Sequence, residues 1–192
     1  TAPTIIRFTS TTNDGNYILA ASVNITATAS EDVVSGNTIT ATLDTGDTVL
    51  LTAAANGTTL VGTYTVGAGD NSNDLTVSSF SIGTVTDIVG NAMASTTVPG
   101  TNIASGSAIV IDALAPTARL ISCEISSCYG IFERTSITVQ STETGTAYLV
   151  KTGGSGADIT VTNLASITSA DPDLWNSVAI NSASTDTTLA LA

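Results

Sequence analysis

Acidic side chains in turn-like segments are the residues of this sequence best suited to chemistry. Asp14 lies in an Asn-Asp-Gly turn signal, and Glu31 and Asp32 follow an alternating apolar segment. Asp87 lies in the run Thr-Asp-Ile-Val-Gly-Asn, and Asp112 opens a proline-containing linker. Calcium takes about six to eight hard oxygens, which irregular loops supply readily. The pattern therefore predicts calcium ligands at these turns. The alternative is solvated turn residues, because Asp favours turns through local backbone hydrogen bonds.

A further acidic stretch, residues 70–74, reads Asp-Asn-Ser-Asn-Asp and is similar to the start of an EF-hand loop. An EF-hand loop requires glycine at its sixth position and glutamate at its twelfth. Here Leu75 stands at the sixth position and Ser81 at the twelfth. The stretch is predicted to be a turn with at most weak calcium affinity.

The two cysteines are the second chemical feature. Cys123 and Cys128 are separated by four residues. Two thiols cannot complete a structural zinc site without other soft ligands. A disulfide across a tight hairpin or loop is predicted in an oxidising compartment. The alternative is a pair of reduced, unrelated thiols.

Enzymatic chemistry has little support. The chain has no histidine, the commonest general base, and no Gly-x-Ser-x-Gly nucleophile motif. Glycoside hydrolysis needs paired carboxylates in a cleft, and such clefts hold sugars with aromatic rings. With one Trp, four Tyr and three Phe in the whole chain, such a cleft is hard to build. We therefore predict that the protein is not an enzyme.

Charge excludes several partners. The 16 acidic and 4 basic residues give a net charge of −12, which repels nucleic-acid phosphates and anionic membrane surfaces. No stretch approaches the roughly 20 apolar residues of a spanning helix. We expect neither nucleic-acid binding nor membrane insertion.

Composition and periodicity favour strands. The chain contains 36 Thr and 22 Ser, and β-branched residues suit a pleated surface. Period-two alternation appears in residues 22–30 (SVNITATAS), 39–43 and 58–66 (TTLVGTYTV), and residues 107–112 (SAIVID) are predicted to form a buried closing strand. Turn signals separate these segments. The sequence therefore predicts an all-β sandwich fold.

An internal repeat divides the chain. Ala2-Pro3-Thr4 recurs as Ala115-Pro116-Thr117, at an offset of 113 positions, and each copy precedes an apolar strand. Two tandem domains are predicted, residues 1–112 and 113–192, joined by a short linker that Pro116 stiffens. The second domain lacks a counterpart of residues 80–112. We expect either a fragment of a longer chain or a second domain completed by a strand from another molecule.

The first domain resembles the Ig-like repeats of very large bacterial surface proteins, including adhesins and the repeats of a cyanobacterial swimming-associated cell-surface protein. The matching segments are residues 22–33 (SVNITATASEDV), 62–75 (GTYTVGAGDNSNDL), 85–92 (VTDIVGNA) and 108–117 (AIVIDALAPT). The second domain resembles another repeat type from such proteins, through residues 140–151 and 175–180.

The resemblance implies tandem Ig-like β-sandwich domains, the second incomplete, exported to the cell surface and stacked as a stalk. In similar repeats calcium lies at domain junctions. That role falls here on Asp87 and Asn91 of the D-x-x-G-N turn and on Asp112 of the linker. The linker departs from the family's usual D-T-T-A-P, because Ala113 and Leu114 replace its two threonines. An apolar junction is the alternative to an ion-bridged one.

The predicted function is that of an extracellular structural or adhesive repeat region of a bacterial cell-surface protein, acting as a rigid stalk or surface fibre. Its expected partners are neighbouring repeats or identical subunits, together with a host or matrix surface. One alternative is a self-assembling filament subunit completed by strand exchange. Another is an accessory carbohydrate-binding module, which an exposed aromatic patch around Trp175 and Tyr148 would favour.

Overall fold

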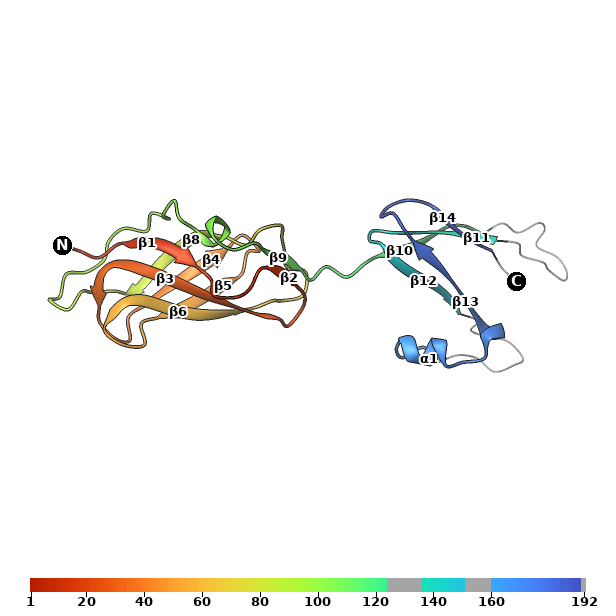
Figure 1. Cartoon of the computed structure of the whole chain (residues 1–192), viewed down its shortest axis with the longest axis horizontal. Helices are drawn as coiled ribbons and strands as arrows, with labels where there is room; N and C mark the ends of the chain where they lie inside the picture. Colours follow the sequence, from red (N-terminus) through yellow and green to blue (C-terminus); the bar gives the residue numbers. More distant parts are fainter. Residues whose placement is uncertain (124–135, 151–159, 191–192) are drawn as a thin grey trace. The chain divides into compact units, whose positions relative to one another are not determined.

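The computed structural model describes residues 1–123, 136–150 and 160–190 (Figure 1). The chain divides into two compact units, Thr1–Ala115 (unit 1) and Pro116–Ala192 (unit 2). Strands dominate both units, and the longest helix of the described residues, α1 (Leu164–Thr168), has five residues. No helix in these described ranges is long and apolar enough to cross a membrane. The predicted all-β sandwich class is confirmed.

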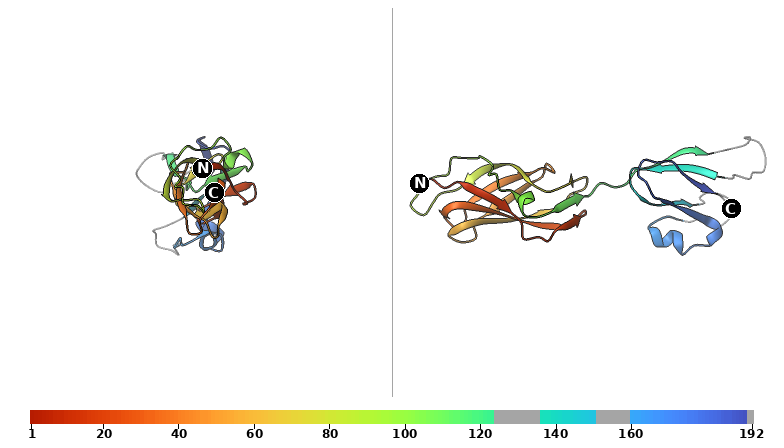
Figure 2. Two further views of the ribbon diagram at one scale, coloured as in Figure 1. Left: turned by 90° about the vertical axis from the view of Figure 1, so that its left-hand side faces the viewer. Right: turned by 45° about the horizontal axis from the view of Figure 1, so that its top comes forward.

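Unit 1 contains nine strands and one short 3-10 helix. These are β1 (Ile5–Thr9), β2 (Gly15–Tyr17), β3 (Ser22–Val33), β4 (Thr38–Leu43), β5 (Thr48–Thr52), β6 (Gly57–Thr65), β7 (Asn71–Ser72), β8 (Val77–Thr84), η1 (Ile103–Ser105) and β9 (Ile109–Asp112). A six-stranded sheet has the order β1-β3-β6-β5-β4-β8, and a smaller sheet has the order β2-β9-β7 (Figure 2). β2 pairs in parallel with β9, while the pairs of the larger sheet are antiparallel. β5 pairs with both β4 and β6, so the six strands form one continuous hydrogen-bonded sheet.

The strands form where the sequence alternates. In β3, Val23 and Ile25 are fully buried, while Asn24 between them is partly exposed. β6 buries Leu60 and Tyr64 in the same way. Gly62 lies between these two, and a Cβ atom there would stand 2.4 Å from a backbone carbonyl oxygen of β5. Alternation thus selects the buried face, and glycine permits the close approach of β5 and β6.

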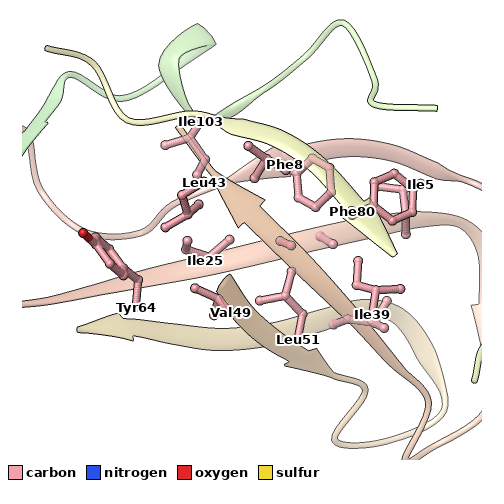
Figure 3. Close-up of a cluster of buried hydrophobic side chains, with 14 of the residues drawn as sticks. Ile5, Phe8, Ile25, Ile39, Leu43, Val49, Leu51, Tyr64, Phe80 and Ile103 are labelled. Carbon is pink, nitrogen blue, oxygen red and sulfur yellow. The ribbon is translucent and has the colours of Figure 1, made fainter. Parts of the chain in front are cut away.

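A single apolar core fills unit 1. Twenty-four buried hydrophobic residues form one cluster (Figure 3). Near one end of it Phe8 of β1 and Phe80 of β8 meet edge to face, with ring centroids 5.7 Å apart and an interplanar angle of 66°. Because β1 and β8 are the two edges of the six-stranded sheet, this contact closes the sheet onto itself.

Unit 2 repeats only part of this arrangement. Its described elements are β10 (Ala118–Cys123), β11 (Ser136–Ser141), β12 (Gly145–Val150), α1, the 3-10 helix η2 (Pro172–Leu174), β13 (Trp175–Ile180) and β14 (Thr187–Ala190). The sheet β10-β11-β14 corresponds to β1-β3-β6, and the pair β12-β13 corresponds to β4-β5. Within the described ranges, unit 2 has no strands corresponding to β8 and β9.

Both units begin with the same hydrogen bonds. In unit 1 the Thr4 N–H donates to Ser30 Oγ (3.0 Å), and the Ser30 N–H donates back to the Thr4 carbonyl (2.8 Å). In unit 2 the Thr117 N–H donates to Thr142 Oγ1 (2.9 Å), and the Thr142 N–H donates to the Thr117 carbonyl (3.0 Å). We call this reciprocal pair the clasp. It gives the sequence repeat a structural basis.

The correspondence continues along the first strand of each unit. Arg7 and Arg119 each donate their Nε–H to a polar side chain on the neighbouring strand, at 3.1 and 3.2 Å. The residue after each arginine is apolar and pairs with an apolar residue of the next strand, Phe8 with Ala27 and Leu120 with Val139. Leu120 therefore holds the place of Phe8. Phe8 is fully buried, whereas Leu120 is 60% exposed.

This difference predicts unequal mutational costs. Phe8→Ala should destabilise unit 1 by about 3–5 kcal/mol, the usual cost of truncating a buried Phe. Leu120→Ala should change the stability of unit 2 by no more than about 0.5 kcal/mol, because its side chain is mostly exposed. Denaturant unfolding measures both. Trp175, the single tryptophan, reports on unit 2 by fluorescence, and circular dichroism reports on both units. Equal losses of unfolding free energy in the two variants would contradict the difference in burial between Phe8 and Leu120.

Candidate functional site: the acidic turns of unit 1

The acidic turns lie at two opposite ends of unit 1. Asp87 bridges Val33 just beyond the end of β8 at Thr84, and we call this the Asp87 end. Asp112 pairs with Asn71 near the other end of β8. We call this end of unit 1 the Asp70 end. At about 3.3 Å per residue, the eight residues of β8 separate these ends by more than 20 Å. One ion cannot take ligands from both ends.

The Asp87 turn is closed by its own hydrogen bonds. Asp87 Oδ1 accepts the backbone N–H groups of Val89 (3.0 Å) and Asn91 (2.8 Å), and Oδ2 accepts the Asn91 side-chain amide (2.6 Å). Gly90 has φ +94°, a left-handed conformation that glycine adopts without strain. Burial would raise the pKa of Asp87, but the hydrogen bonds from Asn91, Val89 and Gly90 outweigh it and lower the pKa. Both carboxylate oxygens are thus engaged inside the turn.

The other predicted calcium ligands have separate roles. Asp14 accepts the Ala108 N–H at 2.8 Å, and Glu31 accepts the Thr1 hydroxyl at 2.9 Å. Asp32 and Asp112 are exposed. Within the described residues, no three acidic, His or Cys side chains gather into a group that could hold a metal ion. The described carboxylates therefore do not assemble the predicted calcium site, and calcium binding stays a prediction.

The EF-hand-like stretch, predicted to be a turn, contains the two-residue strand β7 between a turn at residues 68–69 and a bend at residues 73–74. Asp70 is 9% exposed and accepts the Tyr64 hydroxyl and, at 2.6 Å, the Gly67 N–H. Figure 3 shows Tyr64 beside the apolar core with its hydroxyl oxygen directed away from the other labelled side chains. Asp44 accepts the Ser72 hydroxyl (2.6 Å) and a backbone N–H (3.0 Å). Buried Asp70 and exposed Asp44 thus both hold this segment through hydrogen bonds.

The carboxyl groups of Asp47 and Asp70 form a pair beside Tyr64. The sequence analysis did not predict this pair. Burial, the charge of Asp70 and a hydrogen bond to Asp70 raise the pKa of Asp47. Burial alone would raise the pKa of Asp70, but the hydrogen bonds from Tyr64, Gly67 and Asp47 lower it. Burial and the bond to Asp70 raise the pKa of Tyr64. The one sequence signal was Tyr64 on a buried strand face, six residues before Asp70.

The predicted disulfide lies outside the described residues. Cys123 ends β10, where the backbone alone is described, and Cys128 falls in a range that the structure does not describe.

The aromatic pair of unit 2 is a packing contact. Trp175 and Tyr148 are both half-buried, with ring centroids 5.9 Å apart and an angle of 44° between the rings. The Trp175 Nε1 is buried with no hydrogen-bond partner. Two rings that cover each other in this way leave less planar surface for a sugar than an exposed platform would.

Comparison with known proteins does not assign the chain to a family. No protein-family model matches the sequence, and no curated protein matches it. The resemblance to Ig-like surface repeats therefore stays a prediction from residues 22–117.

The Asp87 turn should stabilise unit 1 in a pH-dependent way. Asp87→Asn should lower the thermal midpoint of unit 1 at neutral pH, because the amide cannot accept all of these hydrogen bonds. The folded pKa is lowered from 3.8, so this stabilisation is present above pH 3.8 and is lost as pH falls through the folded value. Melting curves from neutral to acid pH should show the wild-type advantage shrinking. The exposed Asp32→Asn variant is the matched charge control, and an equal effect of both variants would contradict this role.

The charge of Asp47 should have the opposite effect to that of Asp87 on the stability of unit 1. Its pKa is raised, so at neutral pH its charge opposes folding beside Asp70, and that cost disappears as pH falls and Asp47 binds a proton. Asp47→Asn removes the repulsion and offers a donor to Asp70. It should stabilise unit 1 at neutral pH by less than about 1 kcal/mol, since Asp47 is exposed. Asp74→Asn, also exposed, controls for net charge; a gain from that variant of similar size would contradict a specific pair.

Calcium is tested by melting the protein in excess calcium and then in chelator. The sequence-based calcium prediction requires a higher midpoint in calcium, whereas the dispersed or hydrogen-bonded carboxylates of the described residues favour the same midpoint in both. An ion that binds the native state raises the midpoint by mass action. A clear rise in calcium would support the ligand set predicted from the sequence.

Proposed function

We propose that the chain is an extracellular structural repeat region of a bacterial surface protein and acts as a stalk. The observation that carries this proposal is the clasp, which begins both units with the same reciprocal hydrogen bonds. A repeated start at a sequence offset of 113 residues is expected of modules joined in tandem. The surface location itself rests on the resemblance stated above.

The connection between the units supports a stiff spacer. Ala113 is held to the turn of unit 1, because its N–H donates to the Asp70 carbonyl (2.9 Å) and its carbonyl accepts the Gly69 N–H (3.1 Å). Thr117 is held by the clasp of unit 2. Only residues 114–116 lie between these anchors, and Pro116 fixes one of their φ angles. Little backbone freedom is left for bending.

Charge supports the same role. A net charge of −12 and a surface rich in Thr and Ser keep neighbouring chains apart in solution. We propose neighbouring repeats and a host or matrix surface as the contacts of such a stalk. We propose no catalytic step for the described residues.

The stalk is tested by the spread of distances between the units. Spin labels at Thr59→Cys in unit 1 and Thr188→Cys in unit 2, both exposed positions, are measured by pulsed electron paramagnetic resonance. Cys123 and Cys128 are replaced by Ser in this background. We expect a narrow distance distribution that Pro116→Gly broadens, since glycine restores backbone freedom.

Pro99→Gly, in a loop of unit 1, is the matched control and should leave the distribution unchanged. A wild-type distribution as broad as that of Pro116→Gly would overturn the stalk and indicate a flexible tether.

A further inference from the structure

The first and the last strand of unit 1 lie at its opposite ends. β1 begins near the Asp87 end, because Ile5 pairs with Ala29 of β3 and Val33, at the end of β3, bridges Asp87. β9 finishes at the Asp70 end, where it pairs with β7. Figure 1 shows β1 and β9 toward opposite ends of unit 1. A pull applied before β1 and after β9 therefore acts along the axes of these two strands and not across them.

β9 is hydrogen-bonded on both of its sides. On one side the Gly15 N–H donates to the Ala108 carbonyl (3.0 Å), and β2 pairs in parallel with β9 through three residue pairs. On the other side β7 pairs antiparallel with β9, and the Leu75 N–H donates to the Ile109 carbonyl (2.8 Å). Just beyond β9, both backbone groups of Ala113 are hydrogen-bonded to the turn before β7. Tension toward the linker loads all of these bonds at the same time.

β1 is held against β3 in a similar way. The clasp joins the chain to Ser30 just before β1, and four residue pairs join β1 to β3. Just after β1, the Ser10 hydroxyl donates to the Asn24 carbonyl (2.6 Å), and the Asn24 N–H donates to Thr12 Oγ1 (2.8 Å). A pull on the chain before β1 can only slide this strand along β3, so these bonds also share the load.

Buried side chains oppose the sliding of both strands. Phe8 of β1 and Ile109 and Ile111 of β9 are fully buried in the core of unit 1. Successive side chains of a strand point to opposite faces, so a slip of one residue, about 3.3 Å, would turn all three away from the core. Sliding therefore costs apolar burial as well as hydrogen bonds.

We propose that unit 1 is a force-bearing module in which two shear clamps, β1 on β3 and β9 on β2 and β7, resist tension along the chain. One hydrogen bond adds little net stability, so resistance depends on how many bonds must break together. In shear the bonds of a strand break together, whereas a strand that is peeled from one end loses them one by one. The inference rests on the proposed stalk, because a stalk fixed at two points transmits tension.

Single-molecule force spectroscopy tests the clamps by changing only the direction of the pull. The protein is the full chain with Cys123→Ser and Cys128→Ser. In the shear direction, handles are attached to the two ends of the chain. In the first peeling direction, handles at Ile18→Cys, just after β2, and at the C-terminus peel β9 from β2. In the second peeling direction, handles at the N-terminus and at Asp32→Cys, on β3 at the Asp87 end, peel β1 from β3.

We expect a several-fold higher unfolding force for unit 1 in the shear direction than in either peeling direction. Forced unfolding follows the unfolding rate and not the equilibrium stability, so direction alone can change the force. In the shear direction, unfolding of unit 1 releases about 110 residues, or roughly 400 Å of extended chain, and this length identifies its events.

The matched control uses the same cysteine variants. Ile18 and Asp32 are exposed, so Ile18→Cys and Asp32→Cys should keep the parent thermal midpoint. When either variant is pulled by the two ends of the chain, the high force of the shear direction should return. A lower force that follows the substitution and not the direction would contradict the clamps.

Equal unfolding forces in the three directions would overturn the proposal. The stalk can fail separately, because its test is the spread of distances across the linker. A high force in shear together with a broad distance distribution would support the clamps and reject the stiff stalk. A narrow distribution with equal forces in all directions would support the stalk and reject the clamps.

Discussion

The packing of the first strand against β8 is the contact on which unit 1 depends. Phe8 and Phe80 join the two edge strands of one sheet, and the ring contact turns an open sheet into a closed core. The buried side chains of β3, β4 and β6 then pack against other apolar side chains of the core. Where the corresponding contact is not made, as at Leu120, the same strand pattern leaves a leucine in solvent.

Charge in unit 1 is used mainly to hold turns. Asp87 and Asp70 each bind several donors within a few residues, and Asp14 caps the N–H of Ala108. Such bonds replace water around a carboxylate and fix irregular backbone near the core. The acidic composition therefore has two outcomes: a few carboxylates are structural, and the exposed ones set the negative surface.

The two units begin with the same arrangement of their first two strands. The clasp and the arginine bond place the first two strands of each unit in the same register. This local device is sufficient to begin a sandwich. The rest of unit 1 is completed by β8, η1 and β9, which pack across the two sheets.

The sequence by itself determined the all-β class and the alternating strands, but not the short strand β7 inside the acidic stretch 70–74. These follow from period-two patterns and turn residues, which act between near neighbours. The repeat at Pro3 and Pro116 predicted a second domain from residue 113, and the compact units divide after Ala115. Tertiary structure alone decided where the carboxylates lie: Asp87 and Asp112 are at opposite ends of unit 1, and Asp47 meets Asp70 beside Tyr64. It also decided that Phe8 is buried while Leu120 is exposed. The physical reason is that burial and ligand convergence depend on strands paired across long stretches of sequence.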